Sequence, residues 1–135
     1  MRKSIQILFL LMLSIMISPL WADDDTPIKP IYFAISEPFT INFINQSNRK
    51  AHYLQIKVTL MAHNQEIINN AELNLPIIQD ALRTLFSGQT IEGIDSVEGR
   101  KALQFASLDV VKTILKEETG KDNLDAVYFT SFVLQ

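Results

Sequence analysis

The residues with the most reactive side chains in this cysteine-free chain are two histidines and a set of serines. His52 and His63 are eleven positions apart, at the two ends of a predicted strand. Because a strand rises about 3.3 Å per residue, their Cα atoms would lie ~36 Å apart, too far to share a metal ion. A serine nucleophile also needs a histidine and a carboxylate within hydrogen-bond reach. A small hydrolase would therefore require the fold to bring a histidine to one of the candidate serines, which are Ser87, Ser96, Ser107 and Ser131.

Acidic residues gather near the end of the longest predicted helix, at Glu117, Glu118, Asp122 and Asp125. A pair of carboxylates can perform glycoside hydrolysis, but at a helix end and in a loop such groups are typically solvated charges. Three adjacent aspartates at residues 23–25 could contact a cation, although hard cations need a shaped set of oxygen ligands. The sequence therefore assigns no catalytic residue, no cofactor or cofactor-binding residue and no metal ligand, and it favours a protein that is not an enzyme.

Length and charge restrict the classes of partner. The 135 residues carry a formal net charge of −3, and this length predicts one domain. A chain with net negative charge has no overall attraction to nucleic acid or to anionic lipid. We therefore expect no nucleic acid partner, and because no catalytic residue is assigned we expect no small-molecule substrate either. Without cysteine the protein forms no disulfides, so its stability must come from packing.

The first 22 residues have the three-part layout of a secretory signal peptide. Arg2 and Lys3 precede an apolar run at residues 5–17, which at about 13 residues is shorter than the ~20 of a membrane-spanning helix. We expect cleavage between Ala22 and Asp23, with an uncleaved anchor as the alternative. Cleavage would remove two of the 12 basic residues and leave all 15 acidic ones, giving a formal charge of −5. Residues 23–30 then form a short acidic, proline-containing lead-in to a domain at residues 31–135.

Two patterns of alternating apolar residues predict an antiparallel hairpin. A short strand is expected at residues 31–35, and Pro38 interrupts it because proline lacks the N–H that a ladder needs. Residues 39–43 and 53–61 then place apolar side chains at every second position, which is typical of half-buried strands. A polar turn at residues 45–48 joins them.

The period changes to that of helices after residue 64. Residues 65–73 are weakly helical, and a second helix runs from Pro76 to a stop at Gly88. A longer helix follows over residues 97–118, with Ser96 as its N-cap and Gly120 after its end. Gly99 near its start costs up to ~1 kcal/mol relative to alanine. We interpret this glycine as a packing contact with the preceding helix, with a close approach of another group as the alternative.

The chain ends in a predicted strand at residues 124–134 that is apolar on both faces. Val127, Phe129 and Val133 are expected on one face, and Tyr128, Phe132 and Leu134 on the other. Such a strand is either central in a sheet or supplies a contact surface. Tyr128, Phe132 and Leu134 are therefore candidate protein-contact residues. The order of elements predicts an α+β fold, with an antiparallel sheet built from the N-terminal hairpin and the C-terminal strand and two or three helices packed on one face.

Four stretches together resemble the flagellar basal-body-associated FliL family. They are residues 37–43, 53–60 and 76–87 (followed by Glu98-Gly99), and the terminal run 127–135. The resemblance implies a fold similar to stomatin/prohibitin-like domains and an association with the stator or basal body of the flagellar motor. It also implies a homo-oligomeric ring, with no catalysis and no cofactor.

The resemblance departs from the family at the N-terminus. Family members usually have a full membrane helix and a longer linker before the domain, whereas this chain has a short apolar run and a spacer of only about eight residues. We therefore expect a periplasmic protein, free or attached to the inner membrane or the basal body. The expected role is a non-enzymatic motor accessory that acts through protein contacts, and the alternative is an exported envelope binding module unrelated to flagella.

Overall fold

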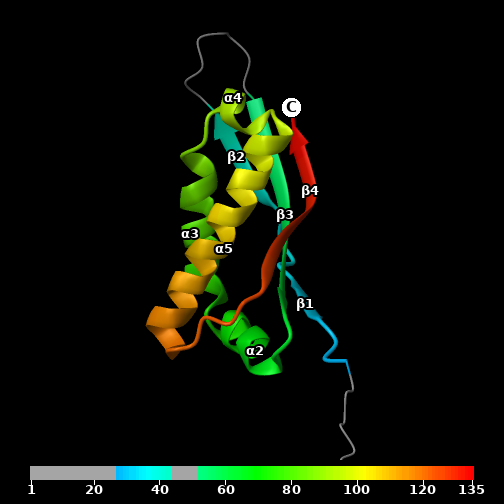
Figure 1. Ribbon diagram of the computed structural model, residues 1–135. Coiled ribbons are helices and arrows are strands. Elements are labelled where there is room, and N and C mark those ends of the chain that lie inside the picture. Colours follow the sequence, from blue (N-terminus) through cyan, green and yellow to red (C-terminus); the bar gives the residue numbers. More distant parts are fainter. Residues whose placement is uncertain (1–26, 44–51) are drawn as a thin grey trace, which may run out of the picture.

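The computed structural model describes residues 27–43 and 52–135, and this part of the chain is an α+β fold (Figure 1). The predicted signal peptide, its Ala22–Asp23 junction and the polar turn at residues 45–48 lie outside the described residues. The elements follow in the order β1 (Ile31–Ala34), β2 (Phe39–Phe43), β3 (His52–Ala62), α2 (Gln65–Leu73), α3 (Leu75–Ser87), α4 (Ile91–Ile94), α5 (Val97–Thr119) and β4 (Ala126–Leu134).

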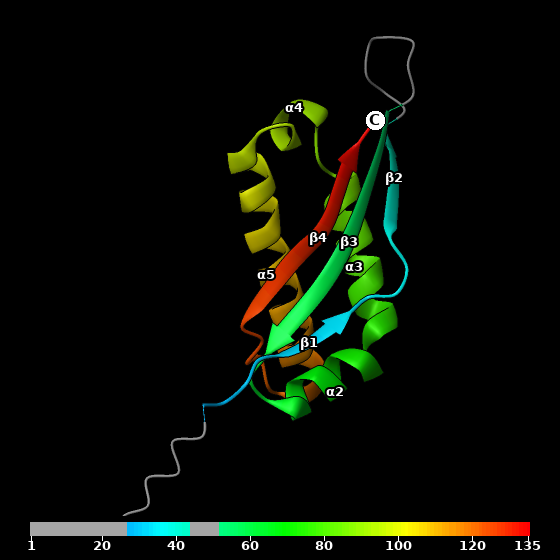
Figure 2. The same cartoon turned by 90° about the vertical axis from the view of Figure 1, so that its right-hand side faces the viewer.

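The four described strands form one antiparallel sheet with β3 at its centre. β1 and β2 pair with the two halves of β3, with Ile31 opposite Ala62 and Phe39 opposite Ile56. β4 pairs with the same stretch of β3, from Leu54 to Met61. It must therefore lie along the other edge of β3, as Figure 2 shows. The predicted hairpin pairing of β2 with β3 is confirmed.

The hydrophobic core lies between this sheet and the helices. Side chains alternate between buried and exposed along β2 and through the first half of β3, because neighbouring residues of a strand point to opposite faces. α3 and α5 lie on one side of the sheet in both views (Figures 1 and 2). The largest fully buried side chains come from all these layers and are Phe39, Phe86, Leu54, Ile56, Leu60, Ile67, Ile78, Leu82, Ile94, Leu115, Val58 and Val111.

A β-bulge in β4 changes which residues of the terminal strand face the helices. Ser131 pairs with Lys57 and Phe129 pairs with Val58, so Thr130 is an extra residue on β4. Beyond it, Phe132 pairs with the fully buried Ile56 and therefore shares the helix-covered face with Phe129.

The predicted division of this strand into two faces is therefore wrong after Thr130. A strict alternation would place Val133 with Phe129, but Val133 pairs with the exposed Gln55. The bulge also separates the three candidate contact residues. Tyr128 is exposed on the open face, whereas Phe132 and Leu134 are half-buried and lie on the helix side.

The helix boundaries follow from capping side chains and one glycine. Asn64 Oδ1 accepts the N–H of Glu66 at the start of α2, and Ser96 Oγ accepts the N–H of Gly99 at the start of α5, each at 2.9 Å. Gly120 ends α5 with φ 76°, a left-handed conformation that glycine adopts without steric cost. The predicted N-cap of the long helix is thus confirmed, whereas the four-residue α4 is too short to show a helical period in the sequence.

Gly99 lies directly against the backbone of α4. A Cβ atom at this position would be 1.7 Å from the carbonyl oxygen of Gly93 and 2.8 Å from its carbonyl carbon. Any side chain at residue 99 would therefore collide with main-chain atoms. Gly99 is thus a packing position as predicted, but its partner is the short α4 and not the helix predicted at residues 76–88.

Candidate protein-contact surfaces

The histidines and serines do not assemble into one site in the described structure. His52 begins β3 and His63 follows its end, which confirms their predicted separation. The Asp125 carboxylate accepts the backbone N–H of His63 and also contacts its ring Nδ1, both at 2.9 Å.

Three of the four candidate serine hydroxyls, those of Ser87, Ser96 and Ser107, bond to the backbone of the helices that they cap or belong to, whereas Ser131 lies on β4. Ser87 Oγ donates to the carbonyl of Arg83, and Ser107 Oγ donates to that of Leu103, each at 2.8 Å. Within residues 27–43 and 52–135, no hydrogen bond joins a serine hydroxyl to a histidine ring. In the same residues no three histidine or acidic side chains lie together as metal ligands. None of the helices described has both the length and the apolar character needed to cross a membrane.

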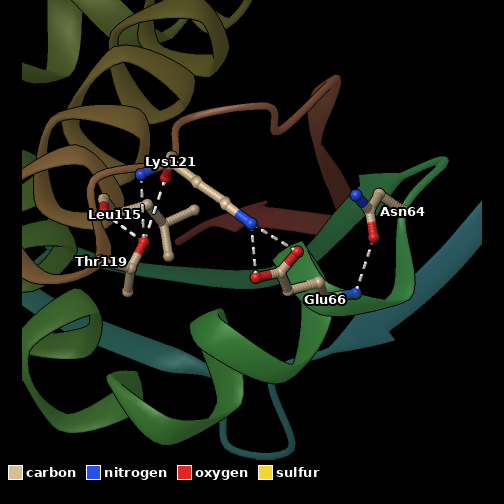
Figure 3. A network of polar contacts seen from close by, with 5 residues as sticks. All are labelled: Asn64, Glu66, Leu115, Thr119 and Lys121. Atoms are coloured by element: carbon tan, nitrogen blue, oxygen red, sulfur yellow. Dashed lines mark hydrogen bonds and ion pairs between the residues drawn. The ribbon is translucent and has the colours of Figure 1, made fainter.

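A charge pair links the loop after α5 to α2 (Figure 3). Lys121 Nζ contacts both carboxylate oxygens of Glu66, at 2.7 and 2.8 Å. Thr119 Oγ1 donates to the carbonyl of Leu115 at 2.7 Å, and Asn64 caps the helix that carries Glu66. The Lys121–Glu66 pair therefore joins the first turn of α2 to the loop after α5, and the other two bonds are local to their own helices.

We predict that this ion pair stabilises the fold only modestly, because both side chains are about half exposed to water. A double-mutant cycle with Lys121→Met and Glu66→Gln should give a coupling free energy of about 0.2–1 kcal/mol. Urea unfolding at low salt and in 1 M NaCl measures it, and the coupling should fall at high salt because the charges are screened. A coupling above about 2 kcal/mol that ignores salt would contradict this prediction.

A groove lies between the first turns of α5 and the terminal strand. Its volume is about 400 Å³, and its lining residues are Val97, Arg100, Lys101, Gln104, Phe129 and Phe132. The Arg100 guanidinium lies 5.0 Å from the centre of the Phe132 ring, within the range of a cation–π contact. Gln104 Nε2 donates to the carbonyl of Val127 at 2.7 Å. The groove thus combines two cations, three apolar side chains and one amide.

The opposite face of the sheet carries a second apolar area. Tyr32 on β1 and Tyr128 on β4 have ring centres 6.3 Å apart, and they are 59% and 38% exposed. Tyr53 and Val133 are also exposed on this face. Aromatic side chains that remain in water on a sheet face are typical of contact surfaces between proteins.

Most of this chain, including both surfaces, matches a known protein family. The family model of "Flagellar basal body-associated protein FliL" matches residues 32–135. The chain belongs to the FliL family. A relative named "Flagellar protein FliL" from Aquifex aeolicus (strain VF5) is 31% identical over 105 residues. The aligned region covers 78% of this chain and 62% of the relative, so the chain spans less than two thirds of that protein's length.

The FliL match includes both candidate surfaces, since it extends from Tyr32 to the last residue. The predicted resemblance to this family is therefore confirmed. The structure places Tyr128 on the open face and Phe132 in the groove, so the predicted trio does not form one surface. That these residues contact another protein stays a prediction. Sequence reasoning did not assign Arg100, Lys101 and Gln104 to a site, and the only signal near them was the unusual glycine at the start of their helix.

Proposed function

We propose that this FliL-family domain is a non-enzymatic accessory of the bacterial flagellar motor that associates with the stator or the basal body through protein contacts. The single observation that carries the proposal is the family match over residues 32–135, because the family is described as basal body-associated. The half-exposed aromatic side chains at Tyr32 and Tyr128 support a role in binding proteins.

The proposal includes a location and an assembly. Residues 1–22 would direct export to the periplasm, with cleavage between Ala22 and Asp23 or retention as an inner-membrane anchor. The domain would share the stomatin/prohibitin-like fold and assemble into a homo-oligomeric ring beside the stator. The antiparallel sheet with helices on one side supports this fold. The mass of the intact exported protein would distinguish cleavage from retention.

Deleting the gene tests the motor role in the cells that carry it. We expect slower swimming, with the largest defect in viscous medium, because a stator accessory matters most at high load. Expression of the full chain from a plasmid should restore swimming. Motility that is unchanged in the deletion strain at every viscosity would contradict the role.

Affinity purification from a flagellated cell tests the partner class. A tagged full chain should recover stator or basal-body proteins from cross-linked envelope extract. Recovery of other envelope proteins alone would favour the alternative of an exported binding module unrelated to flagella. An equally tagged, unrelated periplasmic protein is the control for non-specific capture.

A further inference from the structure

The outer edge of β4 presents main-chain groups that no described strand pairs. Gln135 exchanges two hydrogen bonds with Tyr53, at 2.7 and 2.9 Å, so its N–H and C=O point toward β3. Because these groups alternate sides along a strand, those of Leu134 and Phe132 point away from β3. The main-chain groups of Val127 also point away from β3. Val127 lies opposite Leu60. Leu60 and Val58 direct their main-chain groups toward the β1 side, as the hydrogen bond from the Ile35 N–H to the Val58 carbonyl shows.

The first turns of α5 form a wall beside this edge. The side-chain amide of Gln104 on α5 donates to the outward carbonyl of Val127, so this carbonyl is not available to an added strand. The outward main-chain groups of Phe129, Phe132 and Leu134 lie nearer the C-terminal end of β4 and pair with no described strand. Phe129 and Phe132 also line the groove. An edge strand beside a helix is the arrangement in which an extended peptide can be added to a sheet.

We propose that the groove between β4 and α5 binds an extended, acidic peptide segment of a partner protein, which is added to the sheet as a strand along β4. Main-chain hydrogen bonds to Phe132 and Leu134 would hold the segment, and alternate apolar side chains would contact Val97, Phe129 and Phe132. A carboxylate on the segment would face Arg100 and Lys101.

Charge complementarity argues for an acidic occupant. The chain has a formal net charge of −3, so two adjacent cations at a groove are not the general character of its surface. The only acidic side chain paired with Arg100 among the described residues is Asp95, at 3.9 Å and 72% exposed. No ion pair involves Lys101 in the same part of the chain. Lys101 is therefore available to a carboxylate, whereas Arg100 also donates to the main-chain carbonyls of Ile94 and Asp95 and would bind a carboxylate beside these contacts.

Charge disfavours the described strands of a second copy of this chain as the added strand. The described strands have the sequences IYFA, FTINF, HYLQIKVTLMA and AVYFTSFVL, and none contains an acidic residue. Such a strand from another copy would bring no carboxylate to Arg100 and Lys101. The inference rests on the proposed function as far as the partner belongs to the motor, but peptide binding itself can be measured without cells.

Binding of defined peptides to the full chain tests the groove. The probe is a fluorescein-labelled octapeptide with threonine at every odd position, valine at three even positions and glutamate at the fourth, so that valines and carboxylate share one face of the added strand. The control probe has lysine in place of glutamate. Fluorescence anisotropy at low salt should show saturable binding, with the lysine peptide at least tenfold weaker. A glutamate peptide with N-methylated amides along one edge should lose binding, because it cannot complete the ladder. Equal binding of all three peptides, or of none, would overturn the proposal.

Variants on one helix separate the groove from general electrostatics. Lys101→Glu should weaken binding of the glutamate peptide at least tenfold, whereas Lys112→Glu, which makes the same charge change on α5 away from the groove, should change it less than twofold. Amide exchange adds a positional readout, since the N–H groups of Phe132 and Leu134 should be protected on binding. Equal losses in the two variants, or protection confined to other elements, would overturn the proposal.

Peptide binding at the groove and the motor role can be contradicted separately. A Lys101→Glu chain that no longer binds the peptide but fully restores swimming would show that the motor partner does not bind in this groove. The proposed motor role would be unaffected by that result. A deletion strain that swims normally, while the protein still binds the peptide in vitro, would contradict the motor role but not peptide binding at the groove.

Discussion

Replacing Gly99 with alanine should lower the free energy of unfolding by about 2–3 kcal/mol. The new Cβ would lie 1.7 Å from the carbonyl oxygen of Gly93, and a main-chain oxygen cannot move aside as the end of a flexible side chain can. α4 must therefore shift away from α5. Alanine favours the helix by up to about 1 kcal/mol relative to glycine, which offsets only part of the collision. Urea unfolding followed by circular dichroism measures the change.

Gly88→Ala is the matched control for this prediction. A Cβ at residue 88 would lie 3.6 Å from the nearest main-chain oxygen, an ordinary contact, and its φ of −80° suits any residue. We expect a change of less than about 0.5 kcal/mol there. If Gly99→Ala were as stable as Gly88→Ala, α4 would not rest on the first turn of α5 in solution. The groove would then have a different upper wall, because Arg100 donates from its Nε to the carbonyl of Ile94 on α4 at 3.1 Å.

Sequence periodicity was sufficient to predict the central part of the sheet and the long helices. β2 and the first half of β3 alternate strictly between buried and exposed residues, so their apolar pattern is visible in the sequence. The ends of α3 and α5 depend on local signals that act over a few residues, namely Ser96, Gly88 and Gly120. These features are local, and a single sequence contains them in full.

Periodicity could not predict which residues of the terminal strand point toward the helices. Residues 126–134 are apolar on both sides of a strict alternation, and their two polar residues, Thr130 and Ser131, fall one on each side, so the pattern favours neither facing. Thr130 is an ordinary strand residue, and the bulge arises from the register that β4 adopts against Lys57 and Val58. That register is a long-range property. It moves Phe132 onto the helix side and makes it part of the groove.

The groove itself depends on segments that are far apart in the sequence. Gln104 reaches the carbonyl of Val127 across 23 positions of the chain, and Arg100 lies over the ring of Phe132. On the helix alone these residues resemble any solvated polar face. Only the position of β4 beside α5 gives them a common role, which is why residue types and spacing did not identify them.

Replacing Phe86 with alanine should cost about 3–5 kcal/mol of stability, the typical range for truncating a buried phenylalanine. Its side chain is fully buried, and its ring makes edge-to-face contacts with Phe39 at 5.2 Å and with Phe129 at 5.8 Å. It therefore connects α3 to strands on both sides of β3. Against a typical total of 5–15 kcal/mol, this loss should leave the fold marginal. Chemical unfolding at equilibrium measures it.

Phe105→Ala removes the same atoms from a site that is 59% exposed on α5, so it is the matched control. We expect a loss below about 1 kcal/mol there, because the side chain gives up little apolar contact. Amide exchange in Phe86→Ala adds a more specific test. Phe39 on β2 and Phe129 on β4 both lose a ring partner, but β2 keeps the buried Ile41 and Phe43 whereas β4 has one buried residue, Val127, so β4 should open more often than β2. Equal protection of the two strands in the variant would show that the terminal strand is held by its ladder with β3 and not by this aromatic contact.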